Sequence, residues 1–359
     1  MLKTSDHRPA LGVVVVTFNA ADVILENLES LMAGAGEVAL DVVVVDNGST
    51  DGTCETIRNW AAGTQAFTTP DDMPFSLSPC PKPVQIADED SACPGCTAAA
   101  PAITLIESGQ NVGFAAGVNR GLAHLAAKSA SDRFWILNPD AAAAPGAALA
   151  FATAEPGPFS LMGGRVIYTH DPDTIQIDGG TVNRKTGITG NVHLGQSHAA
   201  TPSADPAQMD FITGASMVAS RAFYEAVGPM PEEYFLYYEE VDWAFRRPDD
   251  LPFAYCEGGL VYHRAGTAIG SPTLERIAAP FSQYFKHRGR MRFVRRHLPG
   301  ALLGAWAYSI AKAGQYLLKG HRAEAIALLR GAAGAAPPSN VRDRLAPEAR
   351  AIAFAPFKT

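Results

Sequence analysis

A single carboxylate stands out in residues 134–140, which read FWILNPD. The four apolar residues from Phe134 to Leu137 predict a buried strand, and Asp140 follows its end after an asparagine and a proline. The residues behind it, AAAAPGAALA, offer no competing chemistry. Asp140 is therefore the only charged group of this stretch and a candidate for binding a ligand. A plain Asn-Pro-Asp turn is the alternative interpretation.

A second group of acids lies in YYEEVDW, residues 237–243. Glu239, Glu240 and Asp242 stand among aromatic residues, which raise the pKa of a nearby carboxyl toward neutrality and so favour proton transfer. A solvated acidic helix face is the alternative. It fits poorly because aromatic residues surround the acids.

Both groups need elements that position them. The first 150 residues alternate short β-branched runs with helical patterns, which is typical of an α/β fold with a mainly parallel sheet and helices on both faces. We expect strands at 11–19, 41–47, 102–108 and 133–137, and helices at 21–33, 51–62 and 113–128. Ligands of such folds bind beyond the carboxyl ends of the strands. This rule selects Thr17–Asn19, Asp46–Ser49, Asn111–Gly113 and Asn138–Asp140.

An irregular segment, residues 64–101, interrupts the alternation and is rich in Pro, Ser, Asp and Ala. We interpret it as a mobile surface insertion. Cys93 and Cys96 form a CxxC that would be half of a zinc site, but the spacing from Cys80 is uninformative and no fourth ligand is evident.

The second half of the chain does not continue the alternation of strands and helices. Residues 160–196 predict hairpins, a helix is expected near 220–227, and FAYCEGGLVYH predicts one strand that ends in His263. From about residue 275 the pattern is helical. We therefore expect a first domain at 1–275 and a helical, basic extension at 276–359.

Composition limits the class of protein. The 359 residues are 47% hydrophobic and 18% charged, which predicts a globular protein with a good core. The net charge of −7 argues against a nucleic-acid binder that acts through bulk attraction to phosphates. The absence of a signal-peptide pattern and the odd number of cysteines, five, favour a cytoplasmic location. The most apolar stretch, 301–318, contains Lys312 and predicts an amphipathic or core helix.

Two common nucleotide-binding motifs are absent from the sequence. TFNAAD stands where GxGxxG would follow the first strand, and no GxxxxGK[ST] occurs. Seven other motifs occur in order: VVVVTFN, VVVVDNGSTDGT, NVGFAAGVNRG, ILNPDA, TGASMVASRAFYEAVG, YFLYYEEVDWAFR and LVYHRAGTAIG. The chain resembles family 2 glycosyltransferases in this order, most of all their bacterial rhamnosyltransferase-like branch, over residues 11–297. The resemblance implies a GT-A fold, which is Rossmann-like.

The resemblance implies that a nucleotide-diphosphate sugar binds at the strand ends. Thr17 and Asn19 would line the base pocket. Asp46 would accept hydrogen bonds from the base or ribose, with Asn47 and Ser49 in the same donor-binding motif. Helix caps are the alternative for Asn19, and for Ser49 or the threonine after it.

The diphosphate would lie near NVGFAAGVNRG. Asn111 and Gly113 open a predicted helix whose N–H groups suit phosphate, and Arg120 would add a charged contact unless it lies on a solvated helix face.

A divalent ion is the implied cofactor. In the resemblance, Asn138-Pro139-Asp140 takes the place of the DxD motif, so Asp140 would bind Mg²⁺ or Mn²⁺ and Asn138 replaces the first acid. His263 would be a second metal ligand; an ordinary core or surface histidine is the alternative. Such an ion would stabilise the charge of the departing diphosphate.

The implied base lies in the acidic motif. The family pattern is Glu-Asp-x-Asp with the second acid as base, and here the motif reads Glu239-Glu240-Val241-Asp242. Glu240 therefore stands where aspartate is usual. The extra methylene of glutamate displaces the carboxylate, so Asp242 is an alternative candidate for the base. The alternative function is a non-catalytic nucleotide-sugar-binding or membrane-docked assembly protein.

The expected activity is inverting transfer from dTDP-rhamnose or a UDP-hexose to a glycan or lipid-linked acceptor in bacterial surface polysaccharide synthesis. The stretch KHRGRMRFVRRH, residues 286–297, carries six Lys or Arg and no acid. We expect it, with the following helices, to face anionic lipid in peripheral contact with a membrane. Arg288 or Arg290 reaching the donor diphosphate is one alternative, and a solvated surface helix is the other.

Overall fold

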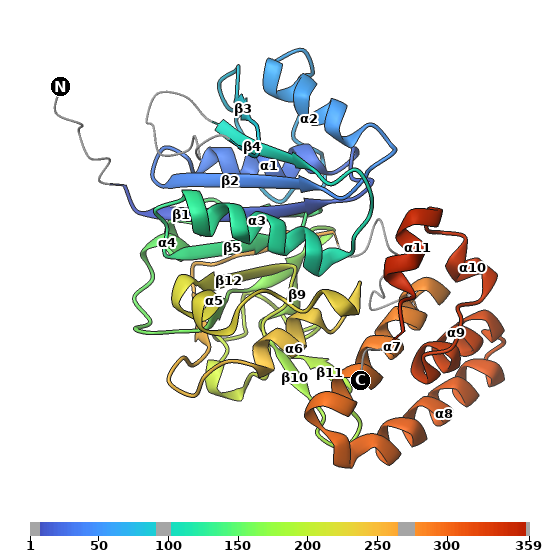
Figure 1. Cartoon of the computed structure of the whole chain (residues 1–359). Coiled ribbons are helices and arrows are strands. Elements are labelled where there is room, and N and C mark those ends of the chain that lie inside the picture. The colour runs from blue at the N-terminus through green and yellow to red at the C-terminus, as the bar shows by residue number, and fades with distance from the viewer. Residues whose placement is uncertain (1–7, 91–101, 265–276, 357–359) are drawn as a thin grey trace.

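The computed structural model describes residues 8–90, 102–264 and 277–356. An eight-stranded sheet forms its centre (Figure 1). In spatial order its strands are β13 (Ala254–Tyr255), β7 (Leu161–Gly163), β12 (Ser216–Ser220), β5 (Arg133–Leu137), β1 (Ala10–Thr17), β2 (Ala39–Asp46), β4 (Ala102–Glu107) and β3 (Gln85–Ala87). Within this sheet β12 runs antiparallel to both neighbours and the other pairs are parallel. The predicted α/β fold with a mainly parallel sheet is confirmed.

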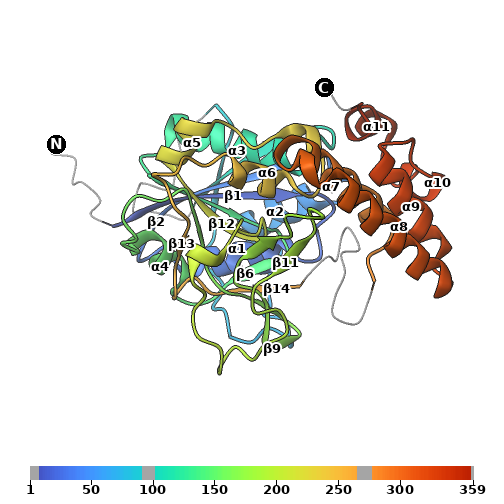
Figure 2. The same cartoon turned by 90° about the horizontal axis from the view of Figure 1, so that it is seen from below.

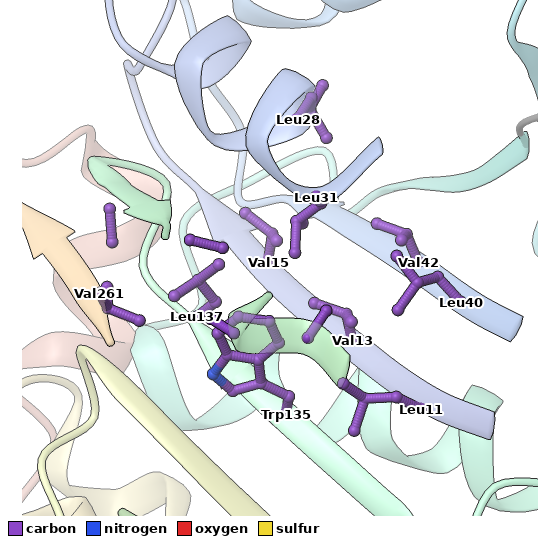
Figure 3. Close-up of a cluster of buried hydrophobic side chains, with 14 of the residues drawn as sticks. Leu11, Val13, Val15, Leu28, Leu31, Leu40, Val42, Trp135, Leu137 and Val261 are labelled. Carbon is purple, nitrogen blue, oxygen red and sulfur yellow. The ribbon is translucent and has the colours of Figure 1, made fainter. Parts of the chain in front are cut away.

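Helices cover both faces of the sheet, as Figure 2 shows with α3, α5 and α6 on one face and α1 on the other. Their bounds are α1 (Ile24–Ala33), α2 (Thr53–Ala62), α3 (Phe114–Lys128), α4 (Ala147–Thr153), α5 (Arg221–Val227) and α6 (Glu239–Phe245). Successive side chains of a strand point to opposite faces. Accordingly Val13 and Val15 pack with α1 through Leu28 and Leu31 (Figure 3).

The alternate valines of β1 point to the opposite face of the sheet. Val14 and Val16 of β1 join the core cluster that includes α3. The helix lies very close to the strand there, since a Cβ on Gly121 would be 2.5 Å from Val14 and one on Gly117 would be 2.7 Å from Val16. The glycines of NVGFAAGVNRG therefore have a packing role. They bring α3 against β1 and so set the position of the loop that precedes the helix.

Register brings the strand ends level. β1 and β2 pair without interruption from Ala10↔Ala39 to Thr17↔Asp46, and the predicted polar clusters follow these ends. A separate four-stranded sheet consists, in spatial order, of β6 (Ala141–Ala143), β14 (Val261–His263), β8 (Val166–Tyr168) and β9 (Asp171–Ile177). A small ribbon pairs β10 (Gly180–Val182) with β11 (Thr189–Asn191).

The predicted single strand over FAYCEGGLVYH is two strands in different sheets, β13 and β14. The Gly258-Gly259 pair divides them. Gly259 passes so close to Phe151 that a Cβ would lie 2.4 Å from the ring, so only glycine permits this crossing between sheets. The correction matters because β14 pairs with β6 and places His263 opposite Ala141, next to Asp140.

The irregular segment is anchored where the structure describes it, through residue 90. Met73, Leu77, Cys80 and Val84 are buried, and β3 extends the main sheet. The backbone N–H of Cys80 donates to the buried carboxylate of Glu29 at 2.7 Å. A mobile insertion does not describe this part, because its few apolar residues enter the core. Cys93 and Cys96 lie outside the described residues.

The described C-terminal helices lie together beside the sheet domain (Figures 1 and 2). They are α7 (Pro280–His297), α8 (Leu302–Leu318), α9 (Arg322–Ala333), α10 (Ser339–Arg342) and α11 (Pro347–Ala353). Among the described helices, none has the length and hydropathy that a membrane crossing requires.

The basic stretch on α7 does not form the expected lipid-facing surface. His287, Arg288, Arg290 and Arg292 are all buried. The guanidinium of Arg290 donates to the carbonyl oxygens of Thr186 and Ala305 and to the hydroxyl of Ser309. Arg288 likewise donates to the Ala355 carbonyl and Arg292 to the Glu233 carbonyl, so backbone carbonyls accept from all three buried arginines. The sequence pattern did not reveal these partners.

Candidate active site

A cavity of about 380 Å³ opens at the carboxyl ends of the strands. Its walls come from the loops after β1, β2 and β5, from α6, and from α7 and the residues after α10. Predicted site residues that line it are Asn19, Asn47, Asn111, Gly113, Asn138, Asp140, Glu239, Glu240 and His263. The fold thus brings together residues that are up to 244 positions apart, from Asn19 to His263.

Asp140 and His263 form the cation-binding candidate. His263 Nε2 lies 3.1 Å from Asp140 Oδ1, and His263 Nδ1 lies 2.8 Å from Gln176 Oε1. If Nδ1 donates to the Gln176 oxygen, Nε2 of a neutral imidazole presents a lone pair to a carboxylate. Two acceptors at that distance need a proton or a cation between them. Carboxylate oxygen and imidazole nitrogen suit Mg²⁺ or Mn²⁺, so the residues fit the implied ion.

The protein alone supplies few ligands. Across the described ranges, no group of three or more His, Cys, Asp or Glu side chains is arranged to hold a metal ion. Asn138 lies beside the pair, with its Nδ2 3.4 Å from His263 Nε2. A cation held here by one carboxylate and one imidazole would take its remaining ligands from substrate phosphates and water, as Mg²⁺ commonly does.

Asp46 has a different place from the one expected. Its Oδ1 accepts a hydrogen bond from the Thr17 hydroxyl at 2.9 Å, and its Oδ2 accepts the N–H groups of Gly48 and Ser49. The side chain is buried and, like Thr17, is not part of the cavity wall. Asp46 therefore shapes the loop that presents Asn47.

The loops after β1 and β2 hold each other. The backbone N–H of Asn19 donates to the Ser49 hydroxyl at 2.9 Å, and the N–H of Thr50 donates to Asn19 Oδ1 at 2.8 Å. Neither α1 nor α2 has a side-chain cap at its N-terminus, so the capping alternatives are wrong. These polar side chains connect two strand ends.

The third loop is fixed by asparagine amides. Asn47 Nδ2 donates to the Gly113 carbonyl at 3.0 Å, and its Oδ1 accepts the N–H of Val112. The N–H of Gly113 donates to Asn111 Oδ1, and that of Phe114 donates to the Phe235 carbonyl. Two N–H groups at the start of α3 are thus already satisfied, which weakens the expectation that this helix end binds phosphate.

Two predicted cationic contacts lie elsewhere. Arg120 forms an ion pair with Glu89 at 2.6 Å. The guanidinium of Arg288 donates to the Ala355 carbonyl, just after α11. Neither side chain is part of the cavity wall.

The acidic motif divides into two environments. Asp242 Oδ2 accepts the Tyr234 hydroxyl at 2.6 Å and an Arg296 N–H at 2.8 Å, and Asp242 Oδ1 accepts from Arg246 at 2.6 Å. Burial alone would raise the pKa of Asp242, but these contacts and His297 hold it well below its ordinary value. A carboxylate paired on both oxygens with a lowered pKa is a poor proton acceptor. This geometry favours a structural role for Asp242.

Glu239 and Glu240 face the cavity instead. Burial raises the pKa of Glu239 well above its ordinary value, and the neighbouring Glu240 adds to the effect. Among the described residues, Glu239 Oε2 has no hydrogen-bond partner although it is buried. Burial also raises the pKa of Glu240, while Lys286 lowers it in part. A carboxyl with a raised pKa beside an open cavity is the usual form of a catalytic base.

Backbone strain marks the same place. Phe235, Tyr237 and Tyr238 all have positive φ angles between 63° and 76°. Bulky residues rarely adopt this conformation, which costs about 1–3 kcal/mol each and persists where the surrounding structure imposes it. The aromatic residues around the acids indicated a special environment, but the strain itself had no sequence signal.

Comparison with known proteins agrees with this geometry. Residues 12–69 match the family model described as "Glycosyl transferase family 2". Together with the fold, this match supports a glycosyltransferase. It covers β1, α1, β2 and α2, the elements that hold Asn19 and Asn47. No curated protein matches the chain at the sequence level.

Two solved glycosyltransferases are similar to the chain. A mannosyltransferase, PcManGT, from Pyrobaculum calidifontis in complex with GDP-Man and Mn²⁺ is 15% identical, with 92% of this chain and 88% of that chain covered and a TM-score of 0.50. TarS of S. aureus, residues 1–349, is 13% identical, with 96% and 88% covered and a TM-score of 0.47. The likeness to the mannosyltransferase, together with the sheet topology, confirms the expected GT-A fold.

Proposed function

We propose that the chain is an inverting, metal-dependent glycosyltransferase that moves a sugar from a nucleotide-diphosphate donor to a hydroxyl of a glycan or lipid-linked acceptor. The observation that carries this proposal is a single cavity that holds the Asp140–His263 pair together with Glu239 and Glu240. One pair suits a divalent ion and the other suits proton transfer, which are the two needs of such a reaction.

The donor side is built for binding. Asn19, Asn47 and Asn111 line the cavity, and their amides fix the loops against which a base or ribose would lie. Asp140 and His263 would hold Mg²⁺ or Mn²⁺, which when bound stabilises the negative charge of the departing diphosphate. The structural neighbour solved with GDP-Man and Mn²⁺ supports a nucleotide sugar and a divalent ion at this site.

The reactive side rests on Glu240. We assign it the proton of the acceptor hydroxyl, whose oxygen forms a bond to the anomeric carbon as the bond from that carbon to the phosphate oxygen breaks. Attack opposite the leaving group inverts the anomeric centre. Burial raises the pKa of Glu240, which strengthens its affinity for that proton.

Finer assignments complete the proposal. We propose that the enzyme has a rhamnosyltransferase-like specificity, with dTDP-rhamnose or a UDP-hexose as the donor. We propose that it acts in bacterial surface polysaccharide synthesis. We also propose a cytoplasmic location, and a division into a GT-A glycosyltransferase domain at 1–275 and a helical, basic extension at 276–359. The motif order over residues 11–297 supports this branch.

A thermal-shift panel of nucleotide sugars with Mn²⁺ tests the proposal. The preferred donor should stabilise the protein only with metal present, and Asp140→Ala should remove that stabilisation. Nucleotide release with acceptor then reports turnover. Equal stabilisation in the presence of a chelator would exclude the metal role, whereas metal-dependent binding without any release would favour the non-catalytic alternative.

A further inference from the structure

A lysine that the sequence motifs did not single out lies in the cavity wall. Lys286 of α7 lines the same cavity as Glu240, and so do Phe281, Arg344 and Leu345 from the C-terminal part. Within the described residues, no hydrogen bond or ion pair within 4 Å joins Lys286 to another side chain. A half-buried ammonium without a partner is uncommon, because burial of a charge is costly unless it is paired.

One face of α7 fixes this lysine. Ser282, Lys286 and Gly289 are spaced at i, i+4 and i+7 and therefore share a helix face. The Ser282 hydroxyl accepts a hydrogen bond from the Tyr237 hydroxyl at 3.1 Å. A Cβ on Gly289 would lie 2.5 Å from the Tyr237 carbonyl oxygen. The strained loop before α6 thus contacts α7 on both sides of Lys286, which holds the lysine near Glu240.

The local charge around Lys286 favours an anion. Burial lowers the pKa of Lys286, the charge of Glu240 opposes this, and Arg290 and Lys312 add to the lowering. The nearest groups of like charge thus outnumber the single carboxylate. Toward solvent, the guanidinium of Arg344 lies 5.0 Å from the ring of Phe281 and adds a second cation to the cavity wall.

Stereochemistry identifies which substrate this cation faces. In an inverting displacement the base acts on the side of the sugar opposite the leaving group. The donor diphosphate belongs with Asp140 and His263, so a cation beside Glu240 lies on the acceptor side. This step rests on the proposed function. We infer that Lys286 and Arg344 form an acceptor subsite that binds an anionic group, phosphate or carboxylate, close to the attacking hydroxyl.

Inorganic phosphate in the presence of a chelator is the direct probe. Titration calorimetry on the full chain should show saturable binding, and Lys286→Met should weaken it at least tenfold. Lys319→Met, at the exposed end of α8, is the matched control and should leave the affinity unchanged. Absence of binding in the wild type, or equal affinity in Lys286→Met, would overturn the inference.

Competition separates the sources of the anion. Displacement of phosphate by glucose 1-phosphate but not by glucose assigns a soluble sugar phosphate, and displacement by glucuronate assigns a carboxylate. Displacement by phosphatidylglycerol vesicles assigns a lipid headgroup. If none of these competes, the phosphate site is not an acceptor subsite and the inference fails.

The two proposals fail separately. Phosphate binding with chelator needs neither donor nor metal, so Asp140→Ala should leave it intact while removing metal-dependent nucleotide binding. Loss of nucleotide binding with retained phosphate binding would count against the glycosyltransferase proposal alone. The reverse result would count against the acceptor subsite alone.

Discussion

The two sides of the cavity are built in opposite ways. On the strand-end side, hydrogen bonds within and between three loops use most of the polar side-chain atoms of Asp46, Asn19 and Asn47. On the α6–α7 side, Glu239 keeps a buried oxygen without a partner among the described residues, and three aromatic residues adopt positive φ. The first side is a satisfied scaffold that suits binding. The second retains unsatisfied groups and strain, which suits chemistry.

Glu240→Gln should have the largest effect. Removing a general base typically costs about 10²–10⁴-fold in rate, and because the base acts in the chemical step, nucleotide affinity should remain nearly unchanged. Nucleotide release and a direct binding titration measure the two quantities. Glu239→Gln serves as the neighbouring control; if it abolishes transfer while Glu240→Gln does not, the base is Glu239.

Asp242→Asn should mainly reduce stability. The fully buried carboxylate offsets Arg246 and Arg296, and removing one member of such a pair costs about 3 kcal/mol, at the low end of the usual range because both arginines are about a third exposed. Urea denaturation measures the loss. The folded fraction should keep its turnover within tenfold. Unchanged stability with lost turnover would transfer the base role to Asp242.

Asn47→Ala should weaken the strand-end side by a smaller amount. It leaves the Gly113 carbonyl and the Val112 N–H without their partner, at a cost of about 1–2 kcal/mol in unfolding free energy. Nucleotide affinity should fall as the loops loosen. Asn340→Ala, an exposed position on α10, is the control. A drop in rate at saturating donor, with affinity intact, would contradict a pure scaffold role.

Glu239 should give the smallest effect, visible as a pH dependence. Because burial raises its pKa above 4.5, the folded state binds more protons than the unfolded state, and stability falls as pH rises above that value. Glu239→Gln should flatten this decline between about pH 5 and pH 8, because glutamine does not ionise. Parallel denaturation curves for both proteins across that range test it; identical slopes would show that Glu239 is ionised.

The local sequence was sufficient for the first half of the fold. Unbroken valine runs marked β1 and β2 as strands buried on both faces, and the strand-end rule then selected the loops that meet at the cavity. Asp140 was recognised because it stands out chemically from its neighbours, and Glu240 because its acidic motif resembles the family pattern. The same reasoning failed for FAYCEGGLVYH, where a Gly-Gly crossing between sheets depends on the distant Phe151 ring.

Three further features depended on tertiary structure. Nothing in the sequence indicated that the Asp46 carboxylate accepts hydrogen bonds from the Thr17 hydroxyl and from N–H groups of its own loop. The pattern suggested a basic surface, yet Arg288, Arg290 and Arg292 of α7 are buried and donate to carbonyl oxygens of remote segments. Lys286 is one of six Lys or Arg within residues 286–297. It lines the cavity because α7 packs against the strained loop at Tyr237. Periodicity and residue type report what a segment can do by itself, whereas the partner of a polar side chain is decided by segments brought close in the folded chain.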